Sequence, residues 1–139
     1  MKENKKTLKY AVITVAVATA LVLTYVWLAP YTIEMDMSVG VGNYTGFDVS
    51  TDRVTFGTVM QSGISHRDVI LANNDNYDKM ANFAVEGNIK EFAIVPASQL
   101  AKANANTSIP VTASIKSFTE YGNYTGKLKI SLRRAVFGM

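Results

Sequence analysis

The residues most suited to recognisable chemistry are three Asn-x-Ser/Thr tripeptides, the acceptor pattern for N-linked sugar. Two of them lie inside a pentapeptide, Gly-Asn-Tyr-Thr-Gly, that occurs at residues 42–46 and again at residues 122–126. Because glycine and asparagine tolerate positive φ, the same pentapeptide also suits a turn between strands. The sequence therefore offers three candidate glycosylation sites: Asn43, Asn106 and Asn123.

The second pentapeptide is also expected to serve the fold. Tyr124 shares its alternation parity with Leu128 and Ile130, so its ring should face the core while Asn123 faces solvent. Residues 120–124 resemble the approach to a tyrosine corner, in which a tyrosine hydroxyl bonds back to the preceding backbone. The first pentapeptide follows an alternating segment and is expected to reverse the chain.

Catalytic and metal-binding patterns are not indicated. His66 is the only histidine, and strand alternation would turn Ser65 and Asp68 apart or away from it, so no catalytic triad is expected. Residues 73–78 are rich in oxygen ligands but lack the glycine and glutamate of an EF-hand loop, which favours ordinary turn chemistry over calcium. We predict no catalytic residue, no cofactor and no metal site.

The N-terminal part of the chain contains a stretch suited to a membrane span. Residues 11–29 are uncharged and largely apolar, and at about 1.5 Å per residue a helix over them is roughly 28 Å long. Pro30 is expected to end it. The sequence thus predicts a transmembrane helix over residues 10–30. Its aromatic residues are expected to lie at the membrane interfaces: Tyr10, Tyr25, Trp27 and Tyr31.

The charges around this stretch predict its orientation. Four lysines and one glutamate precede it, so residues 1–9 should form a cytoplasmic tail and residues 31–139 an extracellular domain. Two alternatives remain open. One is a cleaved signal peptide, for which residues 18–20 offer an Ala-x-Ala site. The other is prepilin-type processing, which the Lys9-Tyr10 junction fits poorly.

The same lysines explain the basic character of the whole chain. Beyond residue 30 the basic and acidic residues balance, so the net charge of +3 belongs to the tail and does not indicate nucleic-acid binding. The chain has no cysteine, so the outer domain must depend on its packed core. The acceptor tripeptides follow a predicted membrane anchor, and the domain that carries them has no cysteine to form disulfides. This combination favours an archaeal cell-surface glycoprotein.

The outer domain shows the alternation of short strands separated by turns. Between residues 32 and 41 apolar side chains occupy every second position, which predicts a strand with one buried face. The alanine-rich residues 96–106 are expected to add one or two helical turns. The remaining pattern predicts an all-β sandwich. The seven expected strands lie at residues 32–41, 52–59, 65–73, 80–87, 91–95, 108–118 and 126–134.

Part of this domain resembles a known family. Between Val54 and Leu132, a Phe-Gly-x-Val turn, a Gly-x-Ser and a strand ending in Asn73 resemble the opening of the ASH/MSP-type immunoglobulin-like sandwiches. Residues 122–130 are similar to their closing pattern, G-x-Y-x-G-x-L-x-I. The resemblance implies an immunoglobulin-like seven-stranded fold and a habit of binding proteins, and it implies no reaction.

These features together predict a non-enzymatic single-pass membrane protein. We expect its outer domain to dock or brace another envelope or membrane protein, a layout similar to that of archaellum stator and envelope-anchor proteins. A pilin- or archaellin-like filament subunit is an alternative, and so is an accessory subunit of a membrane enzyme complex. The expected partners are membrane lipid and a protein of the membrane or envelope. In the filament alternative, the partners include further copies of the chain.

Overall fold

The computed structural model describes residues 2–46, 48 and 52–136 of the chain. They form a long helix, α1 (Lys2–Leu28), and a β-rich head that includes a 3-10 helix, η1 (Asn88–Glu91). An N-terminal apolar helix before an all-β domain is confirmed, but the described residues form eight strands and not the expected seven. The strands are β1 (Tyr31–Gly42), β2 (Val54–Met60), β3 (Ile64–Asn73), β4 (Lys79–Gly87), β5 (Ala93–Ile94), β6 (Ser98–Ala101), β7 (Ala105–Ser114) and β8 (Gly122–Arg134).

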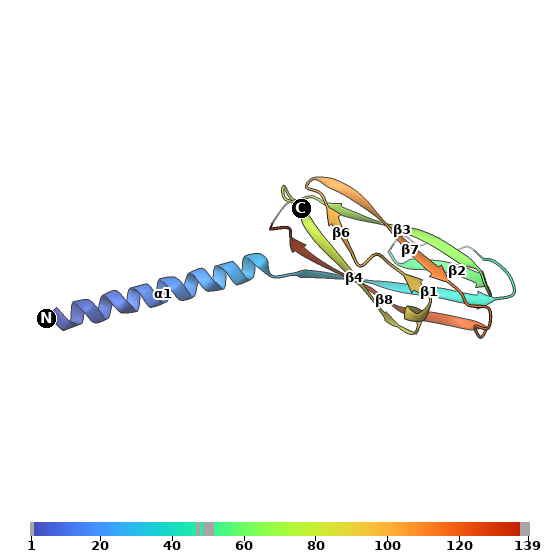
Figure 1. Cartoon of the computed structure of the whole chain (residues 1–139), viewed down its shortest axis with the longest axis horizontal. Helices are drawn as coiled ribbons and strands as arrows, with labels where there is room; N and C mark the ends of the chain where they lie inside the picture. Colours follow the sequence, from blue (N-terminus) through green and yellow to red (C-terminus); the bar gives the residue numbers. More distant parts are fainter. Residues whose placement is uncertain (1, 47, 49–51, 137–139) are drawn as a thin grey trace.

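Helix α1 projects away from the head, and the segment Asn4–Leu28 is long and apolar enough to cross a membrane (Figure 1). The helix ends at Leu28 because the residue before Pro30 is disfavoured in the helical conformation. The helix starts at Lys2, so residues 2–9 of the basic tail form its first turns. The hydroxyls of Thr14, Thr19 and Thr24 donate to the carbonyl four residues earlier at 2.8–2.9 Å, so these three groups are satisfied within the helix.

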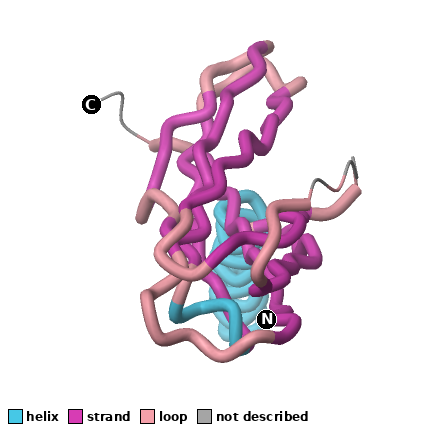
Figure 2. Tube along the Cα trace, turned by 90° about the vertical axis from the view of Figure 1, so that its right-hand side faces the viewer, coloured by secondary structure: helices cyan, strands magenta, loops and turns pink. Residues whose placement is uncertain are grey.

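The strands of the head form two sheets. The larger has the order β2-β1-β8-β4-β6 and the smaller the order β3-β7-β5. β1 and β2 run parallel, and every other pair of neighbours is antiparallel. β1 and β8 are paired from Tyr31–Leu132 to Val41–Gly122, so α1 continues almost directly into a long ladder. Figure 2, seen from the end farthest from α1, shows the helix behind the strands along the long axis of the head.

One hydrophobic core lies between the two sheets. β1 buries Met37, Val39 and Val41 at every second position, as the sequence predicts. The same core contains Ile109 and Val111 from β7 in the other sheet. Each large side chain that is removed from water here contributes about 1.5–3 kcal/mol before the entropy cost. Leu128, Ile130 and Leu132 of β8 are buried as predicted.

Three local expectations are wrong. Residues 96–106 contain no helix, because residues 98–101 pair with β4 as strand β6, and edge pairing outweighs the helix preference of a few alanines. The strand expected at residues 91–95 is reduced to Ala93 and Ile94, because Phe92 has a helical backbone (φ −111°, ψ −25°) after η1. β7 ends at Ser114, so Phe118 lies in a loop.

Candidate functional site

The three candidate glycosylation residues are all exposed. Asn43 follows β1, and Asn123 lies near the start of β8. Because Val41 pairs with Gly122, the two pentapeptides meet at the end of the head farthest from α1, which we call the distal pole. Asn106 pairs with Ala72 in β3, nearer to the helix. Exposure is necessary for modification, and occupancy of the three sites stays a prediction.

The structural roles expected of the two pentapeptides are confirmed. The Tyr124 hydroxyl donates to the Glu120 carbonyl at 2.9 Å, and its ring contacts Phe92 edge-on at a centroid distance of 4.8 Å. This contact reproduces the geometry of a tyrosine corner. After Asn43 the chain turns back, and Gly46 forms an antiparallel bridge with Thr58 on β2. The first copy therefore reverses the chain, as expected.

Of the residues considered for catalysis, His66 and Ser65 are not brought together. His66 is exposed, with its Nδ1 at 2.9 Å from the Thr112 hydroxyl. Ser65 lies on the other face of β3, and its hydroxyl donates to the Phe56 carbonyl at 3.4 Å. Within the described residues, no group of three or more histidine, aspartate or glutamate side chains could hold a metal ion.

The oxygen-rich segment at residues 73–78 is an internally bonded turn. The buried Asn73 carboxamide donates to the carbonyls of Tyr77, Ala101 and Lys102 at 2.9–3.1 Å. Its own oxygen accepts from the backbone N–H of Asp75 at 3.3 Å. A side-chain hydrogen bond from Lys79 lowers the pKa of Asp75 below its ordinary value. These hydrogen bonds are the side-chain-to-backbone turn bonds that the sequence predicts for this segment.

This turn forms one side of an arginine clamp at the junction of helix and head. The guanidinium carbon of Arg134 lies 4.0 Å from the centroid of the Trp27 ring and 4.1 Å from that of Tyr77. Trp27 belongs to the last turn of α1, Tyr77 to the β3–β4 connection and Arg134 to the end of β8. The next residue is also held, since the backbone N–H of Ala135 donates to the Asp78 carbonyl at 2.9 Å. The sequence predicts a membrane-interface position for Trp27 but does not indicate its contact with Arg134.

Replacing Arg134 by alanine is expected to loosen the angle between α1 and the head. Of the two rings, only Trp27 belongs to the helix. A cation–π contact contributes about 0.5–1 kcal/mol at an exposed site, so undocked orientations should become roughly 2- to 5-fold more populated. Because the chain has no cysteine, spin labels can be placed at Thr19→Cys and Lys90→Cys in the full chain in nanodiscs. The distance distribution should be narrow for the parent and broad for Arg134→Ala. Equal broadening by the exposed neighbour, Arg133→Ala, would contradict a specific clamp.

The distal pole exposes a second set of side chains, here called the distal patch and consisting of Met60, Ile64 and Phe118. Phe118 is 96% exposed, and the other two are 49% and 61% exposed. The β2–β3 loop, between Met60 and Ile64, is joined by hydrogen bonds to the β7–β8 loop that carries Phe118. The Gln61 amide donates to the Thr119 carbonyl at 2.6 Å, and the Ser62 and Ser117 hydroxyls are 3.0 Å apart. A firmly held loop thus presents an aromatic ring to its surroundings.

The outer face of the larger sheet carries an ion-pair row across β1, β8 and β4. Glu34 lies 3.1 Å from Lys127 and 3.6 Å from Lys129, which also pairs with Glu86 at 2.9 Å. The hydrogen bond from Lys127 lowers the pKa of Glu34, and the hydrogen bond to Glu86 raises the pKa of Lys129. These groups are open to solvent, so they keep this face soluble and add little stability.

Comparison with known proteins gives no relative for this arrangement. The sequence matches no protein-family model, and no match is found among curated proteins or solved structures.

Proposed function

We propose that the chain is a single-pass membrane protein whose outer domain docks or braces another envelope or membrane protein. The apolar α1, with side chains exposed along its length and aromatic residues near both ends, supports insertion in lipid. The lysines at its start favour a cytoplasmic N-terminus and an extracellular head. We place Tyr10, Tyr25, Trp27 and Tyr31 at the two interfaces.

The observation that carries this proposal is the distal patch. Phe118 stands almost fully in solvent on a loop fixed by hydrogen bonds, at the pole opposite the membrane helix. β1 covers most of the length between these poles, and 12 residues at about 3.3 Å each hold the patch roughly 40 Å from the end of α1. An aromatic anchor on a stiff support is typical of a protein contact residue.

An immunoglobulin-like sandwich of the ASH/MSP type is the fold that we propose for the head. Two sheets over one core and the tyrosine corner at Tyr124 support it. The fold implies protein binding and no reaction, which agrees with the separation of His66 from Ser65. We further propose that the head is an archaeal envelope glycoprotein with sugar on the exposed Asn43, Asn106 and Asn123. Exposure of all three residues supports this part of the proposal.

Photo-crosslinking from position 118 tests the docking function. We expect benzoylphenylalanine at Phe118 in the full chain, irradiated in native membranes, to give one dominant adduct with a different envelope or membrane protein. The matched control is the same group at Ile70, which is 60% exposed on the outer face of β3, away from the pole. Phe118→Asp should weaken co-purification of that partner at least about tenfold, since aromatic anchors contribute upwards of about 1.4 kcal/mol.

The other outcomes are equally informative. Adducts only between copies of the chain would support the filament alternative, and a stable association with subunits of a membrane enzyme would support the accessory-subunit alternative. A lone monomer with no adduct at position 118 would contradict the proposal.

A further inference from the structure

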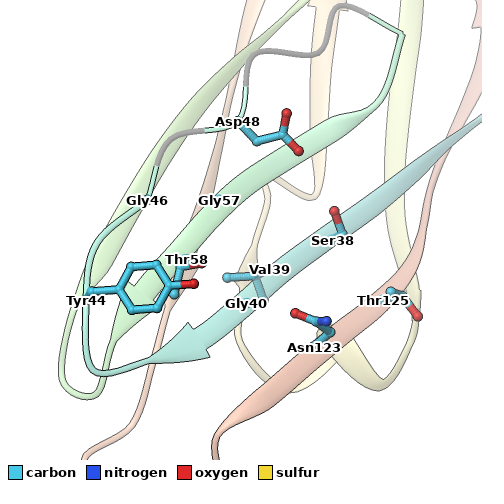
Figure 3. Close-up of a pocket in the computed structure, with 10 residues that line it drawn as sticks. All are labelled: Ser38, Val39, Gly40, Tyr44, Gly46, Asp48, Gly57, Thr58, Asn123 and Thr125. Atoms are coloured by element: carbon cyan, nitrogen blue, oxygen red, sulfur yellow. The ribbon is translucent and has the colours of Figure 1, made fainter.

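A groove of about 560 Å³ lies on the outer face of the larger sheet, where the two pentapeptides meet (Figure 3). Its size falls within the range of roughly 300–1,000 Å³ that is usual for small-molecule sites. β1, β2 and β8 form its base, and Tyr44, Gly46 and Asp48 form one wall. Residues from both pentapeptides line it, including Tyr44 and Gly46 from the first and Asn123 and Thr125 from the second.

The floor of the groove contains two glycines, Gly40 and Gly57, and a third, Gly46, lies in the wall. Gly40 is the critical one. A Cβ atom at this position would lie 3.2 Å from both the Asn123 Oδ1 and the Thr58 Oγ1, and would therefore occupy the space between the two polar side chains. The absence of that side chain leaves backbone at the floor, where a ligand can approach closely.

The polar side chains around this floor are available to a ligand. They are the hydroxyls of Ser38, Thr58 and Thr125 and the carboxamide of Asn123 (Figure 3). Among the described residues, none of these side-chain groups has a hydrogen-bond partner within the protein. Hydroxyl and amide groups can both donate and accept, so they suit a ligand with several hydroxyl groups.

The aromatic wall and the lack of basic lining residues among those described favour an uncharged sugar over an anionic ligand. The ring of Tyr44 is 64% exposed and stands beside Thr58 at the edge of the floor (Figure 3). Its electron-rich face can pack against the C–H face of a sugar ring. Asp48 supplies a carboxylate, and the described residues that line the groove include no lysine or arginine, which disfavours phosphate or sulfate. Arg67 donates to the Asp48 main-chain carbonyl and so holds its backbone.

We propose that this groove binds a neutral pyranose sugar, stacked on Tyr44 and hydrogen-bonded to Thr58 and Asn123. The sugar has two possible sources with the same chemistry. One is the chain's own N-linked glycan, because Asn123 lines the groove and Asn43 adjoins Tyr44. The other is a glycan of a neighbouring envelope molecule. This inference does not depend on the distal patch or on its partner.

The test uses the full chain in nanodiscs, made in a host without N-glycosylation. Glucose, galactose, mannose and N-acetylglucosamine are titrated separately at millimolar concentration and followed by saturation-transfer NMR. At least one sugar should bind, and Tyr44→Ala should weaken its binding at least tenfold. Gly40→Val should abolish binding by filling the floor. Tyr121→Ala is the matched control, because Tyr121 is 63% exposed but lies outside the groove.

A second arm uses the chain from a glycosylating host to separate the two sources. If the chain's own glycan occupies the groove, the Tyr44 ring should show nuclear Overhauser contacts to it, and added sugar should no longer bind. If an outside glycan is the ligand, added sugar should bind to both forms. The proposal is overturned if no sugar binds in the first arm and Tyr44 contacts no glycan in the second. It is overturned equally if Tyr44→Ala and Tyr121→Ala have the same effect.

Discussion

Alanine in place of Gly126 is expected to lower the free energy of unfolding by about 3 kcal/mol or more, whereas alanine in place of Gly46 should change it by less than about 1 kcal/mol. The two residues are the last glycines of the identical pentapeptides, so local sequence does not distinguish them. The difference lies in what surrounds them. A Cβ on Gly126 would lie 2.0 Å from the Glu86 carbonyl oxygen and 2.7 Å from Cγ2 of Ile89.

Gly46 has more space, because its nearest neighbour to a new Cβ is the Thr58 Oγ1 at an ordinary 3.5 Å. Gly126 instead pairs across the ladder with Gly87, whose φ of +92° brings the two backbones together. Thermal unfolding of the full chain in detergent, followed by the β-sheet circular dichroism signal, provides the measurement. The Gly126 variant should melt more than about 10 °C below the parent. Similar midpoints for the two variants would show that the close approach of β4 and β8 is wrong.

Features that depend on neighbouring residues in the sequence could be predicted. Alternation in β1 and β8 places one row of side chains toward the core, because a strand with one solvated face must segregate its side chains. The tyrosine corner follows similarly, since Tyr124 bonds to a residue only four positions earlier. Both depend on local geometry and on the period of two, which the sequence displays directly.

Features that depend on distant segments could not be predicted. β6 forms because β4 offers an unpaired edge, and nothing within its four residues requires an extended backbone. The arginine clamp joins positions 27, 77 and 134, whose proximity follows only from the strand order of the larger sheet. The groove was missed for the same reason. The sequence gives each pentapeptide a local role, a chain reversal for the first and a tyrosine corner for the second, whereas only the pairing of β1 with β8 places the two copies side by side.

Asn73 shows how one buried side chain organises the helix-proximal end of the head. Its carboxamide nitrogen carries two hydrogens and lies within 3.1 Å of three carbonyl oxygens, which belong to the β3–β4 turn, the end of β6 and the β6–β7 connection. Asn73→Ala would leave these buried or part-buried acceptors without their donor. Because each unsatisfied buried group costs about 1–3 kcal/mol, the free energy of unfolding should fall by about 3 kcal/mol.

Asn73→Asp separates the loss of hydrogen bonds from the loss of volume. The aspartate has nearly the same shape, but when ionised it directs a charged oxygen at the three carbonyls and has no hydrogen to donate. It should therefore destabilise the head more than alanine does at neutral pH. Burial beside carbonyl oxygens favours the protonated form, so the folded-state pKa of the new carboxyl lies above its unfolded value of about 3.9. The destabilisation should consequently shrink as the pH is lowered through the folded-state pKa.

The same thermal unfolding assay, repeated at several pH values, tests both substitutions. Asn74→Ala is the matched control, since Asn74 is exposed and its replacement should stay within about 0.5 kcal/mol of the parent. A pH-independent Asn73→Asp defect, or equal effects at positions 73 and 74, would exclude the donor role. The Tyr77 carbonyl is one of the three acceptors, and its ring stacks on Arg134, so Asn73→Ala should also broaden the helix-to-head distance distribution. We therefore expect this one carboxamide to affect both the stability of the turn and the orientation of the head relative to α1.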